Sequence, residues 1–461
     1  MLDLGLATFL LGFLALGVRR PFLWTLAYLY VDILAPQKIS WSLLKAVPAS
    51  LIVFVLAFAG WAFADDKTGA RFGFRQVLLL FLLIYCGITT MGADFPIDAE
   101  AKWDWVWKAL LFAMFLPLAL RTRLRIEAAA LVMVLSAGAI IICGGIKTAA
   151  GGGGYGMLRL FVDENAGLYE GSTLSTVAIA IIPLIVWLAK YGTVFPRGKL
   201  VTLFAIALTF ACLLIPIGTQ TRTGLLCIGL LAVMALRNVK RRFLYLAAIG
   251  LLLTIAVPFL PQSYTERMNT IENHQSDASA STRVAVWKWT LEYAKDHPFG
   301  GGFDAFRGNH IVVQRRSVEQ TGSVAQVDVD TSTDKARAYH SAYFEMLGEQ
   351  GYPGLFAWLL LHVLGLIQLE MVQRRLRKSE QPRDQSDAAL ASALQQGNIV
   401  YLLGAAFVGI AFQPFIYMLI ALQIALVQQV KRRHRPPPYR PPLPRGLTNA
   451  AKTAQPSELA T

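Results

Sequence analysis

Long uncharged apolar segments alternate with polar segments along most of the chain. A bilayer core needs about 20 consecutive apolar residues for one spanning helix, and several segments reach or approach that length. Together they predict an all-α, polytopic integral membrane protein with about 12–13 transmembrane helices. The clearest uncharged segments are 47–64, 77–91, 128–146, 173–189, 200–218, 225–236 and 243–260.

The composition supports the membrane assignment and excludes other classes. Hydrophobic residues make up 55% of the chain and charged residues 16%, whereas soluble domains carry about 25% charged residues. A soluble enzyme, a fibrous protein and a disordered chain are therefore excluded. The four cysteines, Cys86, Cys143, Cys212 and Cys227, all lie inside apolar segments. This placement indicates packing residues rather than a disulfide framework or a zinc site.

Basic residues cluster in alternate polar segments, as in membrane proteins that keep lysine and arginine on the cytoplasmic side. This pattern accounts for the net charge of +14 without a nucleic-acid partner. The predicted cytoplasmic clusters are 19–20, 67–75, 121–125, 197–199, 237–242, 374–378 and 431–435. The predicted outer segments are 35–45, 92–104, 149–172, 219–223 and a large loop, 261–340.

These patterns divide the chain into four predicted regions. Residues 1–199 form an N-terminal transmembrane region, and residues 200–368 form a core that includes the outer loop 261–340. Residues 369–430 add C-terminal transmembrane helices. Residues 431–461 form a basic, proline-rich cytoplasmic tail, which we expect to be disordered and to contact anionic membrane lipids.

The large outer loop contains a predicted surface helix. Ser281 and Thr282 can cap a helix, and apolar residues follow at helical spacing up to residue 293. Pro298 ends the pattern, and three glycines at 300–302 predict a flexible turn. We therefore expect short helices in this loop.

Arginines on the outer side are informative, because basic residues are otherwise kept on the other side. Their planar guanidinium groups suit phosphate, to which they donate two parallel hydrogen bonds. Arg222 lies in a tight turn at membrane depth, which favours a ligand. For Arg283 a solvent-facing side chain explains the charge equally well. For Arg159 and Arg267, snorkelling or pairing with a carboxylate is the simpler explanation.

His340 lies where the polar loop returns to the membrane, and Glu345 and Glu349 follow it, spaced for one helix face. A histidine there can take a proton from a hydroxyl at neutral pH. A cap or an interfacial residue is the alternative for a histidine at a helix start. The spacing of the other histidines fits no metal site, so we predict no catalytic metal and no cofactor.

These motifs, in their order and spacing, resemble the O-antigen ligase and polymerase superfamily. The N-terminal half, with Trp41-Ser42 and Pro48, is similar to O-glycosylation ligases associated with the exosortase A system. The resemblance covers residues 1 to 430. It rests on Thr221-Arg222-Thr223-Gly224, Glu266-Arg267-Met268, Asp277 to Arg283, Trp287, His297-Pro298, Gly300-Gly301-Gly302-Phe303, His340-Ser341-Ala342-Tyr343 and Leu347 to Gly351.

The resemblance implies a glycosyltransferase of the bacterial inner membrane. Such enzymes transfer a glycan from undecaprenyl pyrophosphate to an acceptor hydroxyl on the periplasmic face. The acceptor is the lipid A core of lipopolysaccharide or a protein. Arg222, Arg283 and Arg267 are expected to hold the pyrophosphate, while His340, with Glu349 as a second candidate, is expected to assist the acceptor. Many relatives have a glycine where this chain has Thr223, so the turn beside Arg222 need not match theirs.

Direct displacement without a metal would invert the sugar carbon, because arginines can stabilise the leaving pyrophosphate. A polymerase of exopolysaccharide or O-antigen, with a glycan repeat as acceptor, fits the same residues. A transporter or flippase for lipid-linked sugar is a second alternative, and it predicts charges lining a path through the membrane. A structural scaffold leaves the outer arginines unexplained.

Overall fold

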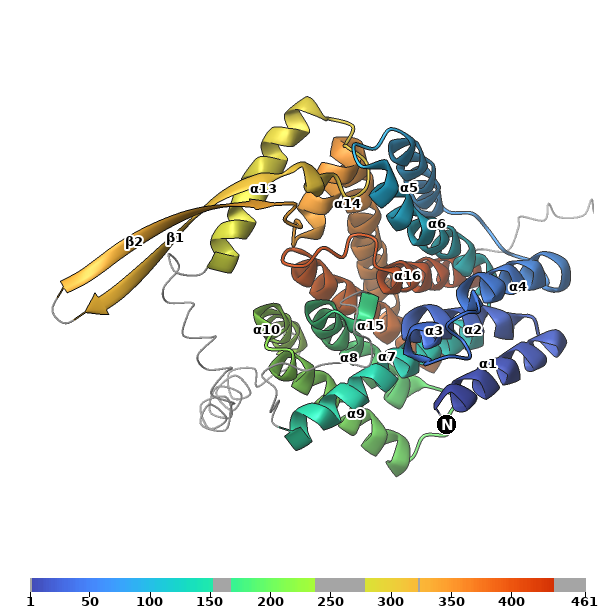
Figure 1. The fold of residues 1–461 in the computed structure, drawn as a ribbon. Coiled ribbons are helices and arrows are strands. Elements are labelled where there is room, and N and C mark those ends of the chain that lie inside the picture. Colours follow the sequence, from blue (N-terminus) through green and yellow to red (C-terminus); the bar gives the residue numbers. More distant parts are fainter. Residues whose placement is uncertain (1, 152–166, 237–277, 322–323, 435–461) are drawn as a thin grey trace, which may run out of the picture.

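The apolar segments form a bundle of helices, which confirms the all-α, polytopic membrane fold. The structure is a computed structural model that describes residues 2–151, 167–236, 278–321 and 324–434 (Figure 1). Six of the described helices are long and apolar enough to cross a membrane, and three apolar helices are shorter. The expected total of 12–13 spans stays a prediction, because part of the chain lies outside the described residues.

The N-terminal region is built around α2, which packs against α1, α4 and α7. Aromatic side chains contribute to the contact with α4, where the rings of Tyr28 and Phe54 are centred 5.4 Å apart. Its helices are α1 (Leu2–Arg19), α2 (Phe22–Leu34), α3 (Pro36–Ile39), α4 (Ala49–Ala64), α5 (Phe74–Met91), α6 (Pro96–Ala119) and α7 (Arg123–Gly151).

The second half of the bundle is centred on α8 and α14. Helix α8 packs against α9, α10 and α15, and α14 packs against α5, α15 and α16. Pro414 starts α16, as expected for a proline at a first helical position. The elements are η1 (Gly167–Tyr169), α8 (Gly171–Tyr191), α9 (Lys199–Gly218), α10 (Arg222–Leu236), α14 (Ala342–Leu376), α15 (Pro382–Ala405) and α16 (Pro414–Arg433).

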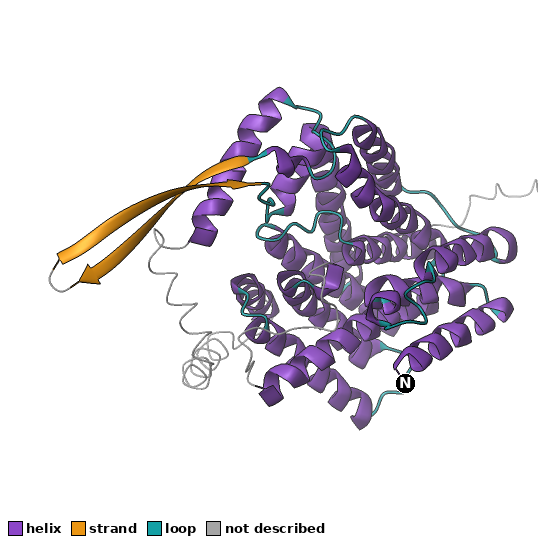
Figure 2. Ribbon diagram, viewed as in Figure 1, coloured by secondary structure: helices purple, strands orange, loops and turns teal. Residues whose placement is uncertain are grey.

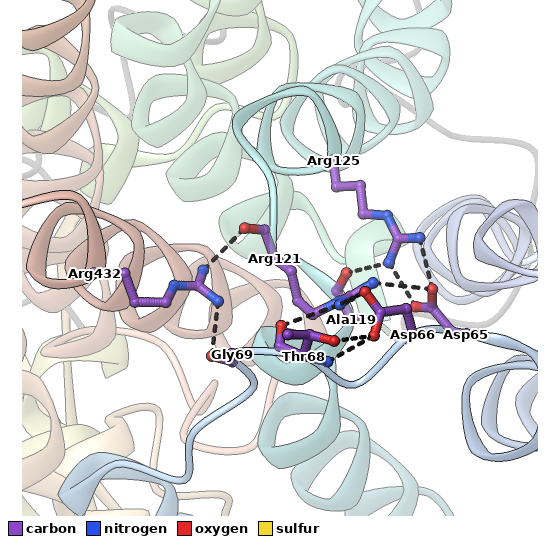
Figure 3. Close-up of polar contacts among 8 residues, drawn as sticks. All are labelled: Asp65, Asp66, Thr68, Gly69, Ala119, Arg121, Arg125 and Arg432. Carbon is purple, nitrogen blue, oxygen red and sulfur yellow. Dashed lines mark hydrogen bonds and ion pairs between the residues drawn. The ribbon is translucent and has the colours of Figure 1, made fainter. Parts of the chain in front are cut away.

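Three of the basic clusters that we predict to be cytoplasmic, 67–75, 121–125 and 431–435, meet through their described residues at one end of the bundle, here called the basic end. Arg121 and Arg125 both pair with Asp65, and Arg432 donates to the backbone oxygens of Gly69 and Arg121 (Figure 3). These contacts join segments that precede α5, follow α6 and end α16. The charge pattern therefore predicted correctly which polar segments lie together.

The outer loop folds into more than the expected helices. Helix α13 (Ala278–Asp296) confirms that the loop contains the predicted helix, and η3 (Ala305–Gly308) follows it. Strands β1 (His310–Thr321) and β2 (Val324–Lys335) then form an antiparallel hairpin, with His310 opposite Lys335. The hairpin was not expected from the sequence. It projects away from the bundle (Figures 1 and 2).

Candidate functional site

Helix α13 is fixed against the start of α14 by aromatic contacts. The rings of Trp287 and Phe344 stack with centroids 5.0 Å apart, and Trp287 Nε1 donates a 2.9 Å hydrogen bond to the carbonyl oxygen of Tyr339. Arg283 lies one helical turn before Trp287 and so on the same face of α13. The packing therefore brings half-buried Arg283 beside the residue that follows Tyr339, which is His340.

His340 has an uncommon backbone conformation. Its φ is +48°, in the left-handed region that non-glycine residues seldom occupy. Such conformations cost about 1–3 kcal/mol, persist where the surroundings fix them and cluster at functional sites. Two features fix the backbone of His340. The hydrogen bond from Trp287 to the carbonyl oxygen of Tyr339 holds the preceding residue, and α14 begins just after His340.

Four influences set the charge state of His340. Partial removal from water lowers its pKa, and the positive charges of Arg283 and, more weakly, Arg337 lower it further. The carboxylate of Glu170 acts in the opposite direction. The net effect is a lowered pKa, so the imidazole is neutral at pH 7 and can accept a proton.

Glu170 connects His340 to the turn before Arg222. Its carboxylate caps α8 by accepting from the backbone amides of Ser172 and Thr173. One turn into α8, the hydroxyl of Ser175 bonds those of Thr219 (2.8 Å) and Thr221 (2.9 Å). Arg222 begins α10 directly after this hydroxyl cluster. Sequence reasoning missed Glu170, since no motif distinguishes it from other loop carboxylates.

Thr223 does not disturb the turn beside Arg222. The residue with a positive φ is Gln220, at +51°, whereas Thr223 lies buried in the first turn of α10. The residue that packs closely against its neighbours is Gly224. A Cβ atom there would lie 2.6 Å from that of Pro216 and 3.0 Å from that of Ser175. A glycine is therefore required at 224 and not at 223.

Glu349 belongs to a buried charge cluster below the start of α14. Lys102 of α6 donates to Glu345 at 2.7 Å and to Glu349 at 2.8 Å, and its ammonium lies 3.8 Å from Asp304. Glu349 is 0% exposed and also accepts a 3.0 Å bond from the amide of Asp304. The amide of Ala411 donates to Glu345 at 3.0 Å. The cluster ties α6, α14 and two loops together.

The glycine run at 300–302 is a packed segment, not the flexible turn expected. The amides of Gly301 and Gly302 each donate a 3.0 Å bond to α14, to the oxygens of Gly348 and Glu349. Helix α14 breaks opposite this run at Gly351, which has φ +62° and ψ −166°. A Cβ atom at Gly351 would lie 2.5 Å from the amide nitrogen of Gly300. The glycines therefore allow two backbones to touch.

The structure brings some predicted site residues together and leaves others apart. Arg283 lies close enough to His340 to lower its pKa, Arg222 begins a helix at the same end of the bundle, and Glu349 lies in the interior with Lys102. Arg267 lies outside the described residues. No group of three or more metal-ligating side chains occurs among the residues that the structure describes.

The fold and these contacts define a multi-pass membrane protein with a charged site at the end opposite the basic end. Residues 206–359 match the family described as O-antigen ligase, and residues 1–193 match a family of unknown function (DUF5935). Residues 206–359 are therefore an O-antigen ligase domain, which supports the resemblance to the O-antigen ligase and polymerase superfamily. The similarity to ligases associated with the exosortase A system stays a prediction. This domain indicates a glycan-transferring enzyme of the ligase or polymerase type. No curated protein matches the chain.

Proposed function

We propose that the protein transfers a glycan from undecaprenyl pyrophosphate to an acceptor hydroxyl at the periplasmic face of the bacterial inner membrane. The acceptor is the lipid A core or a protein. The observation that carries the proposal is the position of His340, held in a left-handed conformation within the electrostatic influence of Arg283 and Glu170, at the end opposite the basic clusters. The positive-inside rule assigns the basic end to the cytoplasm and this end to the periplasm.

In the proposed reaction His340 removes the proton from the acceptor hydroxyl as its oxygen attacks the anomeric carbon. The bond from that carbon to the pyrophosphate oxygen breaks, and the lipid pyrophosphate leaves with the bonding electrons. Arg222 and Arg283 neutralise the charge that develops on it, without a metal ion. Attack opposite the leaving group inverts the sugar carbon, and the proton on His340 passes to water. Arg267 remains a third candidate for the pyrophosphate.

We assign the base to His340 rather than to Glu349. Both carboxylate oxygens of Glu349 accept hydrogen bonds from Lys102, and its side chain is fully buried. A base must lie within hydrogen-bonding reach of the acceptor hydroxyl. Glu349 is therefore proposed as a positioning residue that holds the start of α14.

The interior of the bundle argues against the transporter alternative. Arg75 is 2% exposed and donates to Gln423 at 2.7 Å and to the carbonyl oxygen of Leu361 at 3.1 Å. His362 is 1% exposed and bonds Asn398 at 2.9 Å. These groups are sealed among helices, whereas a transport path for a sugar needs polar groups that water can reach.

The decisive experiment is a transfer assay with purified protein, a fluorescent undecaprenyl-pyrophosphate glycan and membrane extract as acceptor. His340→Ala and Arg222→Ala should each lower the rate at least about 100-fold, as expected for a lost base or a lost contact to the leaving group. His310→Ala and Arg307→Ala are matched controls on exposed residues of the same loop, and both should keep the wild-type rate. Transfer should also survive EDTA.

Three results would change the assignment. An unaffected His340→Ala variant would remove the proposed base. A ladder of glycan repeats in place of a single transfer would identify a polymerase. Movement of the labelled lipid across proteoliposomes, without transfer, would identify a transporter.

A further inference from the structure

A cavity of about 660 Å³ lies near the basic end, on the opposite side of the bundle from the proposed active site. Its walls come from the last turns of α14, the first half of α15 and the ends of α8 and α10. The volume is within the range of about 300–1,000 Å³ that is usual for small-molecule sites. The lining is polar over α14 and α15 and includes Gln373, Arg374, Arg377, Gln395, Tyr191 and Met234.

Two arginines at this cavity, Arg374 and Arg377, have guanidinium N–H groups that are available to a ligand. Arg374 uses its Nε to donate a 2.7 Å bond to Glu370, and this bond leaves its terminal nitrogens available. Arg377 makes no side-chain hydrogen bond or ion pair among the described residues. The two side chains lie three residues apart on one face of a helix end. Glu370 offsets one of the two charges, and the mouth keeps a net positive charge with free guanidinium donors suited to phosphate.

The floor of the cavity is held by a network of amides. Gln373 donates to Gln395 at 2.8 Å, and Gln395 in turn donates to the carbonyl oxygen of Leu366 at 3.2 Å. Gln396 bonds Ser392 at 3.1 Å on the neighbouring turn of α15. These bonds fix the side chains in place, so the polar floor is preformed.

An exposed apolar stripe leads along α14 to the arginines. Val363, Ile367 and Met371 are all exposed and are spaced four residues apart, which places them on one face of the helix. Arg374 follows Met371 by three residues and continues that face. Apolar side chains in the bilayer that end at a basic pocket match the two parts of a lipid.

We propose that this cavity binds the phosphate headgroup of an anionic membrane phospholipid, with the acyl chains along the stripe of α14. Basic pockets between transmembrane helices on the cytoplasmic side are a recurrent form of anionic-lipid site. Arg374 and Arg377 hold the phosphate, and the amide floor receives a hydroxylated headgroup. The site does not depend on the proposed transfer reaction.

The test uses full-length protein in detergent with phosphatidylglycerol as the probe and phosphatidylcholine as the neutral comparison. Native mass spectrometry counts the lipids retained, and thermal unfolding measures stabilisation. The double variant Arg374→Gln/Arg377→Gln should bind phosphatidylglycerol about tenfold or more weakly, because hydrogen bonds to a charged group are lost. The double variant Arg19→Gln/Arg20→Gln removes two exposed arginines elsewhere and should bind like wild type.

Lipid-free unfolding midpoints of both double variants should equal that of wild type, since the replaced side chains are exposed. A site variant that retains phosphatidylglycerol as wild type does would overturn the proposal. So would equal retention of phosphatidylcholine by wild-type protein. Stabilisation by inorganic phosphate to the same extent as by the lipid would show a site for free phosphate and refute the lipid assignment.

Discussion

The two ends of the bundle both contain a cation between carboxylates, but they use it differently. At the basic end Arg433 pairs with Asp384 and, at 2.6 Å, with Asp387, which joins the end of α16 to the start of α15. At the opposite end Lys102 holds Glu345 and Glu349, which follow His340 on α14. The first cluster joins two helices, whereas the second also fixes the helix that follows the proposed base.

Similar ion pairs can therefore serve stability alone or stability together with function. Arg433 and its partners lie far in sequence from His340, the proposed base. Lys102 is 13% exposed and is surrounded by Asp304, Glu345 and Glu349, and the loop 298–304 that it contacts lies against the break in α14. Losing Lys102 should therefore disturb the site, and losing Arg433 should not.

The largest expected effect comes from Lys102→Met. It leaves buried carboxylates without their cation, which costs about 3–5 kcal/mol of stability. Arg433→Met should cost a comparable amount, because Asp384 and Asp387 are also nearly buried. Only Lys102→Met should also lower the transfer rate of the folded protein. The measurements are thermal unfolding in detergent and transfer rates well below either midpoint.

A rescue variant tests the cause of that loss. Lys102→Met combined with Glu345→Gln and Glu349→Gln removes the uncompensated charges and should regain part of the unfolding midpoint. If Arg433→Met lowers the rate per folded molecule as much as Lys102→Met does, the distinction between the two ends is wrong.

Much of the fold was predictable because its signals are local. Apolar length predicted the helices, and alternating charge predicted that the polar segments around 67–75, 121–125 and 431–435 meet. The hairpin was not predicted, because the helical and glycine signals dominate the pattern of the loop. Val327 and Val329 alternate with polar residues from 326 to 330, shortly after Gly322-Ser323, and this pattern predicts a strand after a turn.

The site was only partly predictable because its contacts are distant in sequence. Arg222, Arg283 and His340 were found as charged or titratable residues on the outer side. Lys102 and Glu170 were not, since their partners lie more than a hundred residues away. Charge on the predicted outer side indicates a site, but only the fold decides which carboxylate is buried and which cation is beside it.

The next largest effect is expected from Gly351→Ala. At φ +62° and ψ −166° an alanine is strained by about 1–3 kcal/mol, and its Cβ would meet the backbone of the 298–302 segment. Gly229→Ala in α10 is the control, because its Cβ would meet nothing within 4 Å. That change should be neutral or stabilising by up to about 1 kcal/mol. Unfolding midpoints measure both, and an unharmed Gly351→Ala variant would contradict the packed-backbone account.

The smallest expected effect is a shift in the pH dependence of transfer. The proposed base acts as neutral imidazole, so the rate should fall as the pH drops through the pKa of His340, which lies below its ordinary value. Glu170→Gln removes a charge that raises this pKa, so the acid limb should move to lower pH. Arg337→Gln removes a charge that lowers it, so the limb should move to higher pH. Each shift should be small, because the groups are partly exposed and salt screens them. Rate profiles of the two variants at one ionic strength measure the shifts, and movement in the same direction would show that His340 does not set the acid limb.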